Sequence, residues 1–165
     1  MDLRKIWFIG LALALTLCGC AAKETLETIA DDIPESPVLG EMREISVRLP
    51  DGAVSPVLSS EAEQLYLSED YEILVQTCPA GNLNDTIQKL TGFDKDQLTV
   101  IETEQDGTRR YDFVWVSAGE DGERLGRAAI LDDGSYHYCL SVLRDAEGEK
   151  SQVVWSEVFS SFGLV

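Results

Sequence analysis

The sequence has few of the residues on which most enzyme chemistry depends. It contains one histidine, His137, and four cysteines, none of them in a Cys-x-x-Cys pair. It has no Gly-x-Ser-x-Gly motif around a nucleophile and no glycine-rich loop followed by Lys-Ser or Lys-Thr. These gaps argue against a serine hydrolase, a dithiol oxidoreductase and a nucleotide-binding protein. We therefore expect a protein that is not an enzyme and that holds no cofactor.

Basic residues are also scarce. The chain has 13 Lys and Arg against 30 Asp and Glu, which gives a formal net charge of −17. Nucleic-acid binding depends on Lys and Arg that neutralise phosphates, so nucleic acid is excluded as a partner. The acidic excess is typical of a well-solvated surface.

Long apolar runs are limited to one segment near the start of the chain. Ile6 to Leu17 is interrupted only by Gly10 and Thr16 and follows the basic pair Arg4-Lys5. About a dozen apolar residues are too few to span a bilayer but fit the apolar region of a secretory signal. The sequence therefore predicts export from the cytoplasm.

The residues after this run, Leu17-Cys18-Gly19-Cys20, resemble the lipidation site of bacterial lipoproteins. The resemblance implies that residues 1–19 are a signal peptide, that Cys20 carries the lipid, and that the protein is anchored on the extracytoplasmic face of the cell membrane. Cys18 is the weaker acceptor, because the bulky Leu17 precedes it. The alternative is an ordinary signal peptide cut without lipidation.

Residues 20–43 are predicted to be an acidic tether. The segment is rich in Asp and Glu, contains Pro34 and Pro37, and has almost no aromatic residues. Such low hydrophobicity with high charge favours an extended chain over a packed core. The folded domain is expected over residues 44–165.

The domain has a β pattern in which Asp-Gly dipeptides mark the turns. Asp-Gly suits the positive φ angles of a type I′ hairpin turn and occurs at residues 51–52, 106–107, 121–122 and 133–134. The last three separate a predicted four-strand antiparallel meander, and three further strands are expected upstream. The seven expected strands are Ile45–Leu49, Gln64–Leu67, Tyr71–Thr77, Leu98–Glu104, Arg110–Ala118, Arg124–Leu131 and Tyr136–Leu143.

Residue alternation within two of these strands predicts how they are covered. Tyr111, Phe113 and Trp115 share one face of their strand, and apolar residues on the other face suggest that it is covered on both sides. In the last strand, Tyr138 and its even-numbered neighbours form one face, and His137, Cys139 and Ser141 form the other.

Two amphipathic helices are predicted to pack on this sheet. Asn82 to Leu90 begins after an N-cap at Asn82 and stops at Gly92, and Ser151 to Phe162 has Ser151 as its cap. Their apolar stripes are formed by Leu83, Ile87 and Leu90 in the first helix, and by Trp155, Val158, Phe159 and Phe162 in the second. An antiparallel sheet packed by two helices gives an α+β fold class.

The order of elements, together with the C-terminal segment from Trp155 to Phe162, resembles the PsbP-like fold. The likeness covers about residues 44–163 and rests on core positions. It implies an antiparallel sheet between helices that serves as a docking or accessory module. No functional residue and no photosynthetic role is implied.

The remaining candidates for chemistry are few. His137 and Cys139 are two residues apart on one strand face, which gives parallel side chains and a poor nucleophile–base geometry. We expect His137 to be structural. Cys78 and Cys139 either form a disulfide or lie apart as small buried side chains, and the sequence leaves both open.

No metal site is expected. Carboxylates in residues 120–123 and 132–134 could attract calcium, but hairpin geometry already accounts for their Asp-Gly steps. Arg109-Arg110 is expected to pair across the hairpin with Glu102 and Glu104. The aromatic residues at strand and helix spacing are expected in the core.

These observations predict a membrane-anchored lipoprotein that acts as a non-catalytic, protein-binding accessory module. The alternative is a lipoprotein that binds a small ligand or a divalent cation, through the aromatic strand face or the acidic turns.

Overall fold

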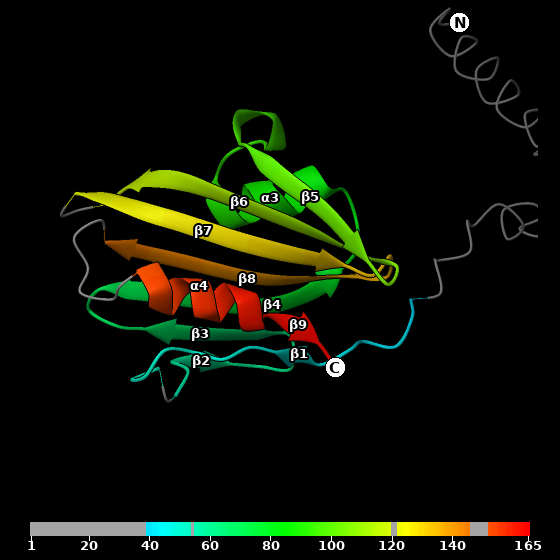
Figure 1. Cartoon of the computed structure of the whole chain (residues 1–165), viewed down its shortest axis with the longest axis horizontal. Helices are drawn as coiled ribbons and strands as arrows, with labels where there is room; N and C mark the ends of the chain where they lie inside the picture. The colour runs from blue at the N-terminus through cyan, green and yellow to red at the C-terminus, as the bar shows by residue number, and fades with distance from the viewer. Residues whose placement is uncertain (1–38, 54, 120–121, 146–151) are drawn as a thin grey trace, which may run out of the picture. The chain divides into compact units, whose positions relative to one another are not determined.

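The computed structural model describes residues 39–53, 55–119, 122–145 and 152–165. The expected signal peptide, the lipidation site at Cys20 and most of the expected tether lie outside these residues, as does the expected cap at Ser151. Within the described part, the chain is an α+β domain with a mostly antiparallel sheet and two α-helices (Figure 1).

The main sheet has seven strands in the order β2-β3-β4-β8-β7-β6-β5, and every neighbouring pair is antiparallel. Its strands are β2 (Leu58–Ser59), β3 (Glu63–Leu67), β4 (Tyr71–Pro79), β8 (Tyr136–Asp145), β7 (Glu123–Asp132), β6 (Thr108–Ala118) and β5 (Val100–Gln105). A separate two-stranded ladder joins β1 (Ile45–Ser46) to β9 (Gly163–Leu164). The expected strand Ile45–Leu49 is therefore shorter than predicted, because its partner is only two residues long.

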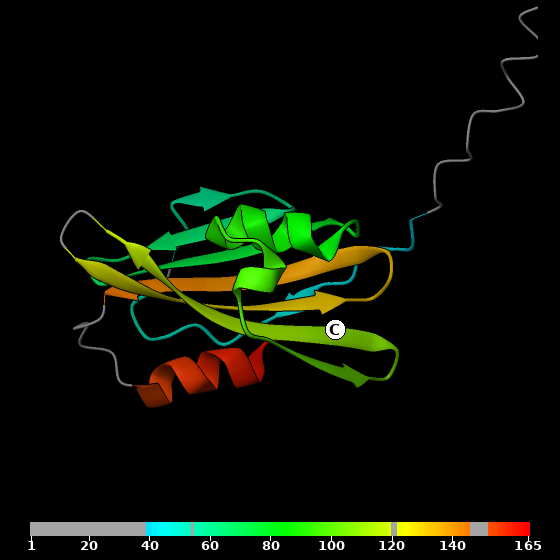
Figure 2. The same ribbon diagram turned by 90° about the horizontal axis from the view of Figure 1, so that it is seen from above.

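The two helices lie on opposite faces of the sheet (Figure 2). Helix α3 (Leu83–Thr91) begins after Asn82, whose side chain accepts a hydrogen bond from Asn84 N–H, and ends at Gly92 with φ of 80°. Both boundary predictions are confirmed. A 3₁₀ turn, η1 (Lys95–Gln97), follows it. Helix α4 (Gln152–Ser161) covers the other face.

Each face of the sheet has its own apolar core. On the α4 side, Trp155, Val158, Phe159 and Phe162 pack on alternate residues of β4, β7 and β8 such as Ile73 and Leu140. On the α3 side, Ile87 packs on Tyr111, Phe113, Trp115, Ala128, Ile130 and Cys139. Strand β8 lies between the two cores, so both of its faces are buried, and its residues divide between the two faces as predicted.

Turn geometry follows the sequence at one Asp-Gly step and departs from it at another. Asp106 and Gly107 have φ of 51° and 76°, as the type I′ turn between β5 and β6 requires. At the β7–β8 turn only Gly134 has positive φ, and Asp133 N–H donates to Tyr136 O, so Gly134 takes the first central position of the turn. The type I′ prediction is wrong there, because the Asp133 carboxylate instead accepts the N–H groups of Ser135 and Tyr136.

Candidate functional site

A groove runs along α4 on the side where the helix leaves strand β6 uncovered. It has a volume of about 490 Å³. The sheet contributes Val114, Val116, Leu125, Arg127, Val142 and Arg144, and the helix contributes Gln152, Trp155, Ser156 and Phe159. The groove is therefore mainly apolar, with two arginines among its lining residues.

This groove exists because β6 is covered on one face only. Its α3 face carries the buried Tyr111, Phe113 and Trp115, whereas Val114 is 62% exposed and Val116 is 50% exposed on the α4 face. The prediction that this strand is covered on both sides is wrong. Helix α4 packs on β4, β7 and β8 and leaves the part of β6 around Val114 and Val116 largely exposed.

Arg127 gives the groove a positive charge close to apolar surface. Its guanidinium carbon lies 4.2 Å from the centre of the Phe159 ring. Burial lowers the pKa of Arg127, and the charge of Asp112 opposes this effect. Within the described ranges, no carboxylate lies at ion-pair distance from Arg127. A cation held over an aromatic ring without an ion-pair partner is suited to an incoming anion.

Trp155 also lines this groove and carries an unsatisfied donor. Its Nε1–H is buried and finds no acceptor among the residues that the structure describes. A buried donor without an acceptor costs roughly 1–3 kcal/mol. The residue is otherwise well packed, with its ring edge-on to Tyr71 at 5.2 Å between centres.

A second cluster of reactive groups lies under α3, on the opposite face. Cys78 in β4 is directly opposite His137 in β8, and Cys139 is opposite Gln76. Cys78, His137 and Cys139 therefore share one face of adjacent strands. Both cysteines are free thiols; Cys78 is half-buried, and Cys139 is fully buried.

The surroundings of the two thiols shift their pKa values in opposite directions. Hydrogen bonding to Cys139 and to His137 lowers the pKa of Cys78 to about 4, against the opposing effect of burial. The charge of Lys89 in α3 acts in the same direction. Hydrogen bonding to Cys78, together with burial, raises the pKa of Cys139 well above its usual value. Cys78 is thus the more acidic thiol of the pair.

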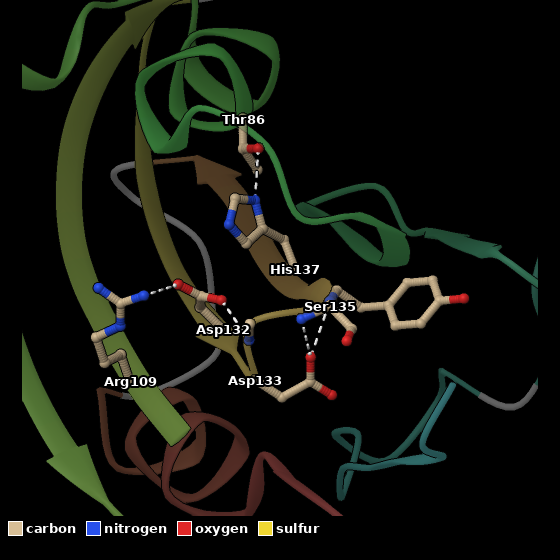
Figure 3. A network of polar contacts seen from close by, with 8 residues as sticks. Thr86, Arg109, Asp132, Asp133, Ser135 and His137 are labelled. Atoms are coloured by element: carbon tan, nitrogen blue, oxygen red, sulfur yellow. Dashed lines mark hydrogen bonds and ion pairs between the residues drawn. The ribbon is translucent and has the colours of Figure 1, made fainter. Parts of the chain in front are cut away.

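His137 is held in place from the helix above it. Its Nδ1 lies 2.8 Å from the Thr86 hydroxyl oxygen, and both side chains are buried (Figure 3). The sequence did not show that His137 and Cys78 lie directly opposite each other. This pairing depends on the register between β4 and β8, two strands that are far apart in the chain.

The carboxylates of the acidic β7–β8 turn are engaged by an ion pair and hydrogen bonds within the protein. Asp132 forms an ion pair with Arg109 at 3.0 Å and accepts Gly134 N–H at 2.8 Å (Figure 3). Asp133 accepts the Ser135 and Tyr136 N–H groups and the Tyr138 hydroxyl. Among the described residues, no group of three potential ligands could hold a metal ion. The acidic residues 120–121 of the other turn lie outside that range.

Arg109 lies opposite Glu104 in the register of the β5–β6 hairpin, as expected, but the ion pairs that the structure describes for Arg109 and Arg110 are with other carboxylates. Arg109 pairs with the buried Asp132 on the strand at its other side. Arg110 points to the α4 face, pairs with Asp112 at 2.7 Å, and donates to the carbonyl oxygens of Phe159 and Phe162. The acceptors of Arg110 are at least partly buried, and they hold its guanidinium group more firmly than exposed glutamates on β5 would.

The aromatic residues are core residues, as expected. Tyr111, Phe113, Trp115, Tyr138 and Trp155 are all buried. No helix in the described ranges is long and apolar enough to cross a membrane. In comparisons with known proteins, no family model matches the chain and no curated protein matches it.

Proposed function

We propose that the chain is a membrane-anchored extracytoplasmic lipoprotein whose domain binds another protein through the α4 groove. The observation that carries this proposal is the incomplete cover of the sheet, which leaves Val114 and Val116 exposed beside Arg127. Exposed apolar side chains that surround a groove are typical of interaction sites. The anchor is the lipid on Cys20, inferred from the sequence of residues 17–20.

The groove favours an extended partner segment with apolar side chains and a carboxylate. Apolar side chains would cover the two valines, and a carboxylate would meet Arg127, which has no ion-pair partner in the described structure. The chain as a whole carries a net charge of −17, so this positive groove stands out against a negative surface. That contrast selects for an acidic segment and orients it.

We also propose that the domain is PsbP-like. Support comes from the consecutive pairing of β5, β6, β7 and β8 as an antiparallel meander, followed by the apolar C-terminal helix. The fold hosts several unrelated roles, so the function is argued from the groove and not from the resemblance.

Site-specific photo-crosslinking in cells tests the binding surface. A benzophenone amino acid at Val116 places the probe in the groove, and the same probe at the exposed Glu102 is a matched control on the α3 face of β5. We expect one intermolecular adduct from position 116 and none from position 102. The substitution Arg127→Glu is expected to abolish the adduct.

Two outcomes would overturn this docking surface. Equal adducts from both positions would show that the protein has no preferred face. A cross-link from position 116 to residues 21–38 of the same chain would show that the acidic tether fills the groove, so that it is not a partner site.

Lipidation is tested separately with an alkyne-bearing fatty acid fed to cells. Cys20→Ala is expected to abolish the label, whereas Cys18→Ala is expected to retain it, since Cys18 belongs to the removed signal. Label retained in Cys20→Ala would disprove the anchor and leave the groove unaffected.

One observation supports the alternative of a small-ligand protein. The groove volume of about 490 Å³ falls within the usual range of small-molecule sites. A single-chain carboxylate such as dodecanoate would match its apolar lining and Arg127. Binding would raise the melting temperature of the full chain, and Arg127→Glu would remove the shift. The same assay with calcium tests the alternative that the protein binds a divalent cation.

A further inference from the structure

The cluster under α3 places two thiols of very different character within reach of each other. The register sets Cys78 opposite His137 and diagonal to Cys139, and their side chains interact. Cys78 is the residue before Pro79, where β4 ends, and it is partly open to solvent. Cys139 lies in the centre of β8 and is fully buried. A reagent from solvent therefore meets Cys78 first.

We propose that Cys78 and Cys139 form a reversible thiol–disulfide pair, in which Cys78 attacks a disulfide-bonded reactant and Cys139 resolves the mixed disulfide. This site is independent of the α4 groove, which lies on the opposite face of the sheet. Cys78 is suited to the attacking role because it is the accessible thiol of the pair and has the lowered pKa, and the thiolate is the nucleophile in such exchange.

The exchange balances in two steps. The Cys78 thiolate attacks one sulfur of the reactant, forms a mixed disulfide and expels the other sulfur as a thiolate. That thiolate takes the proton of the Cys139 thiol, and the Cys139 thiolate then attacks the Cys78 sulfur. The second half of the reactant leaves as a thiolate and is protonated by water. The two cysteines are oxidised, and the reactant disulfide is reduced to two thiols.

Strand register makes the resulting bridge strained. Diagonal residues on antiparallel strands have Cα atoms about 7–8 Å apart, whereas disulfides usually need less than about 7 Å. Closing the bond must draw Cys78 toward Cys139 against the β4–β8 pairing, which continues to Pro79. Strained disulfides are easily reduced, so the bond is suited to switching and not to permanent cross-linking.

His137 acts here as a positioning residue. It lies directly opposite Cys78 in the register of β4 and β8, and the Thr86 hydroxyl fixes the orientation of the ring. Removing that hydroxyl frees the ring without altering either cysteine. Thr86→Val therefore tests the role of the ring, and Thr86→Ser, which keeps the hydroxyl, is its matched control.

The experiment uses the reduced full chain in detergent with glutathione disulfide as the probe, followed by peptide mapping. We expect glutathione on Cys78 first and then a Cys78–Cys139 linked peptide, which a monothiol reductant reverses. Cys139→Ser is expected to stop at the mixed disulfide on Cys78. A mixed disulfide on Cys78 that never resolves in the wild-type chain, or reaction at Cys139 first, would overturn the proposal.

A pH profile separates a positioned thiolate from an ordinary thiol. The alkylation rate of Cys78 is expected to stay level between pH 6 and 8, whereas an ordinary thiol gains roughly a hundredfold over that range. Thr86→Val is expected to restore part of this pH dependence, and Thr86→Ser is expected to leave the profile level. A steep wild-type profile would remove the basis for Cys78 as the attacking residue.

Discussion

The ring of Trp115 occupies the space where a side chain at position 126 would begin. Trp115 in β6 and Gly126 in β7 are directly paired, so any side chain at position 126 would point to the same face as the indole. A Cβ built on Gly126 would overlap the Trp115 ring. Glycine is therefore required at this position by packing and not by backbone conformation.

Gly126→Ala is accordingly expected to destabilise the domain by about 1–3 kcal/mol, the usual cost of overpacking a core. Urea unfolding followed by tryptophan fluorescence measures this directly. Gly81→Ala is the matched control, because a Cβ there meets no atom within 4 Å. Equal stability of Gly126→Ala and wild type would mean that the indole moves aside at no cost.

Arg110 ties the sheet to the end of α4, and this contact depends on the shape of its guanidinium group. The group pairs with Asp112 and donates to the carbonyl oxygens of Phe159 and Phe162, three acceptors that a lysine ammonium cannot reach together. Arg110→Lys is expected to cost about 1–2 kcal/mol of unfolding free energy. Arg109→Lys, at an ion pair whose arginine is 47% exposed, is expected to cost less than about 0.5 kcal/mol. Similar losses in both variants would contradict this account.

Asp133 makes the domain sensitive to acid. Burial raises the pKa of Asp133, but the Tyr136 and Ser135 N–H groups and the Tyr138 hydroxyl outweigh it and hold this pKa below its usual value. A carboxyl with a depressed pKa in the folded state contributes stability above its unfolded value, about 3.9, and loses it as the pH falls through the folded value.

Asp133→Asn should therefore lower the unfolding free energy at pH 7 by about 1 kcal/mol, since its side chain still accepts hydrogen bonds but carries no charge. The deficit should shrink toward pH 2 as the wild-type carboxyl is protonated. Urea titrations at pH 7, 4 and 2 measure both effects, with the exposed Asp96→Asn as control. A deficit that did not change with pH would rule out the charge as its source.

The Thr86–His137 hydrogen bond should also contribute to stability. Thr86→Val leaves Nδ1 of a buried imidazole without its partner, which is expected to cost about 1–3 kcal/mol. Thr86→Ser keeps the hydroxyl and should cost less. Thermal unfolding of the two variants compares them directly. A larger loss in Thr86→Ser would show that the threonine methyl group, and not its hydroxyl, is what matters.

The features that the sequence predicted correctly are helix ends and strand faces, which depend on residues close together in the chain. Asn82 and Gly92 marked the ends of α3, and residue alternation assigned the residues of β8 to its two faces. Strands β2 and β9 were missed because two residues are too few for any alternation to show. The misassigned pairing of Arg109 has the same origin, since the hairpin sequence did not show that Asp132 lies on its other side.

The candidate sites could not be predicted from the sequence, because each depends on how elements far apart in the chain pack or pair in the sheet. The α4 groove arises because α4 does not cover β6. The residue pattern of β6 alone suggested that both faces of this strand are buried. Cys78 and His137 meet only because β4 pairs with β8 in one particular register. A shift of that register by one residue would place the thiol and the imidazole on opposite faces.

The short β1–β9 ladder determines how the domain would respond to mechanical tension. Chain leading in from residue 39 is held by Gly40 N–H on the Ser135 hydroxyl, Arg43 N–H on the Tyr138 hydroxyl, and the two residue pairs of β1 and β9. A pull on the N-terminal side loads these few bonds before any bond of the seven-stranded sheet. They would break first and release residues 39–46 while the seven-stranded sheet stayed folded, so this ladder is the first part of the domain to yield under tension.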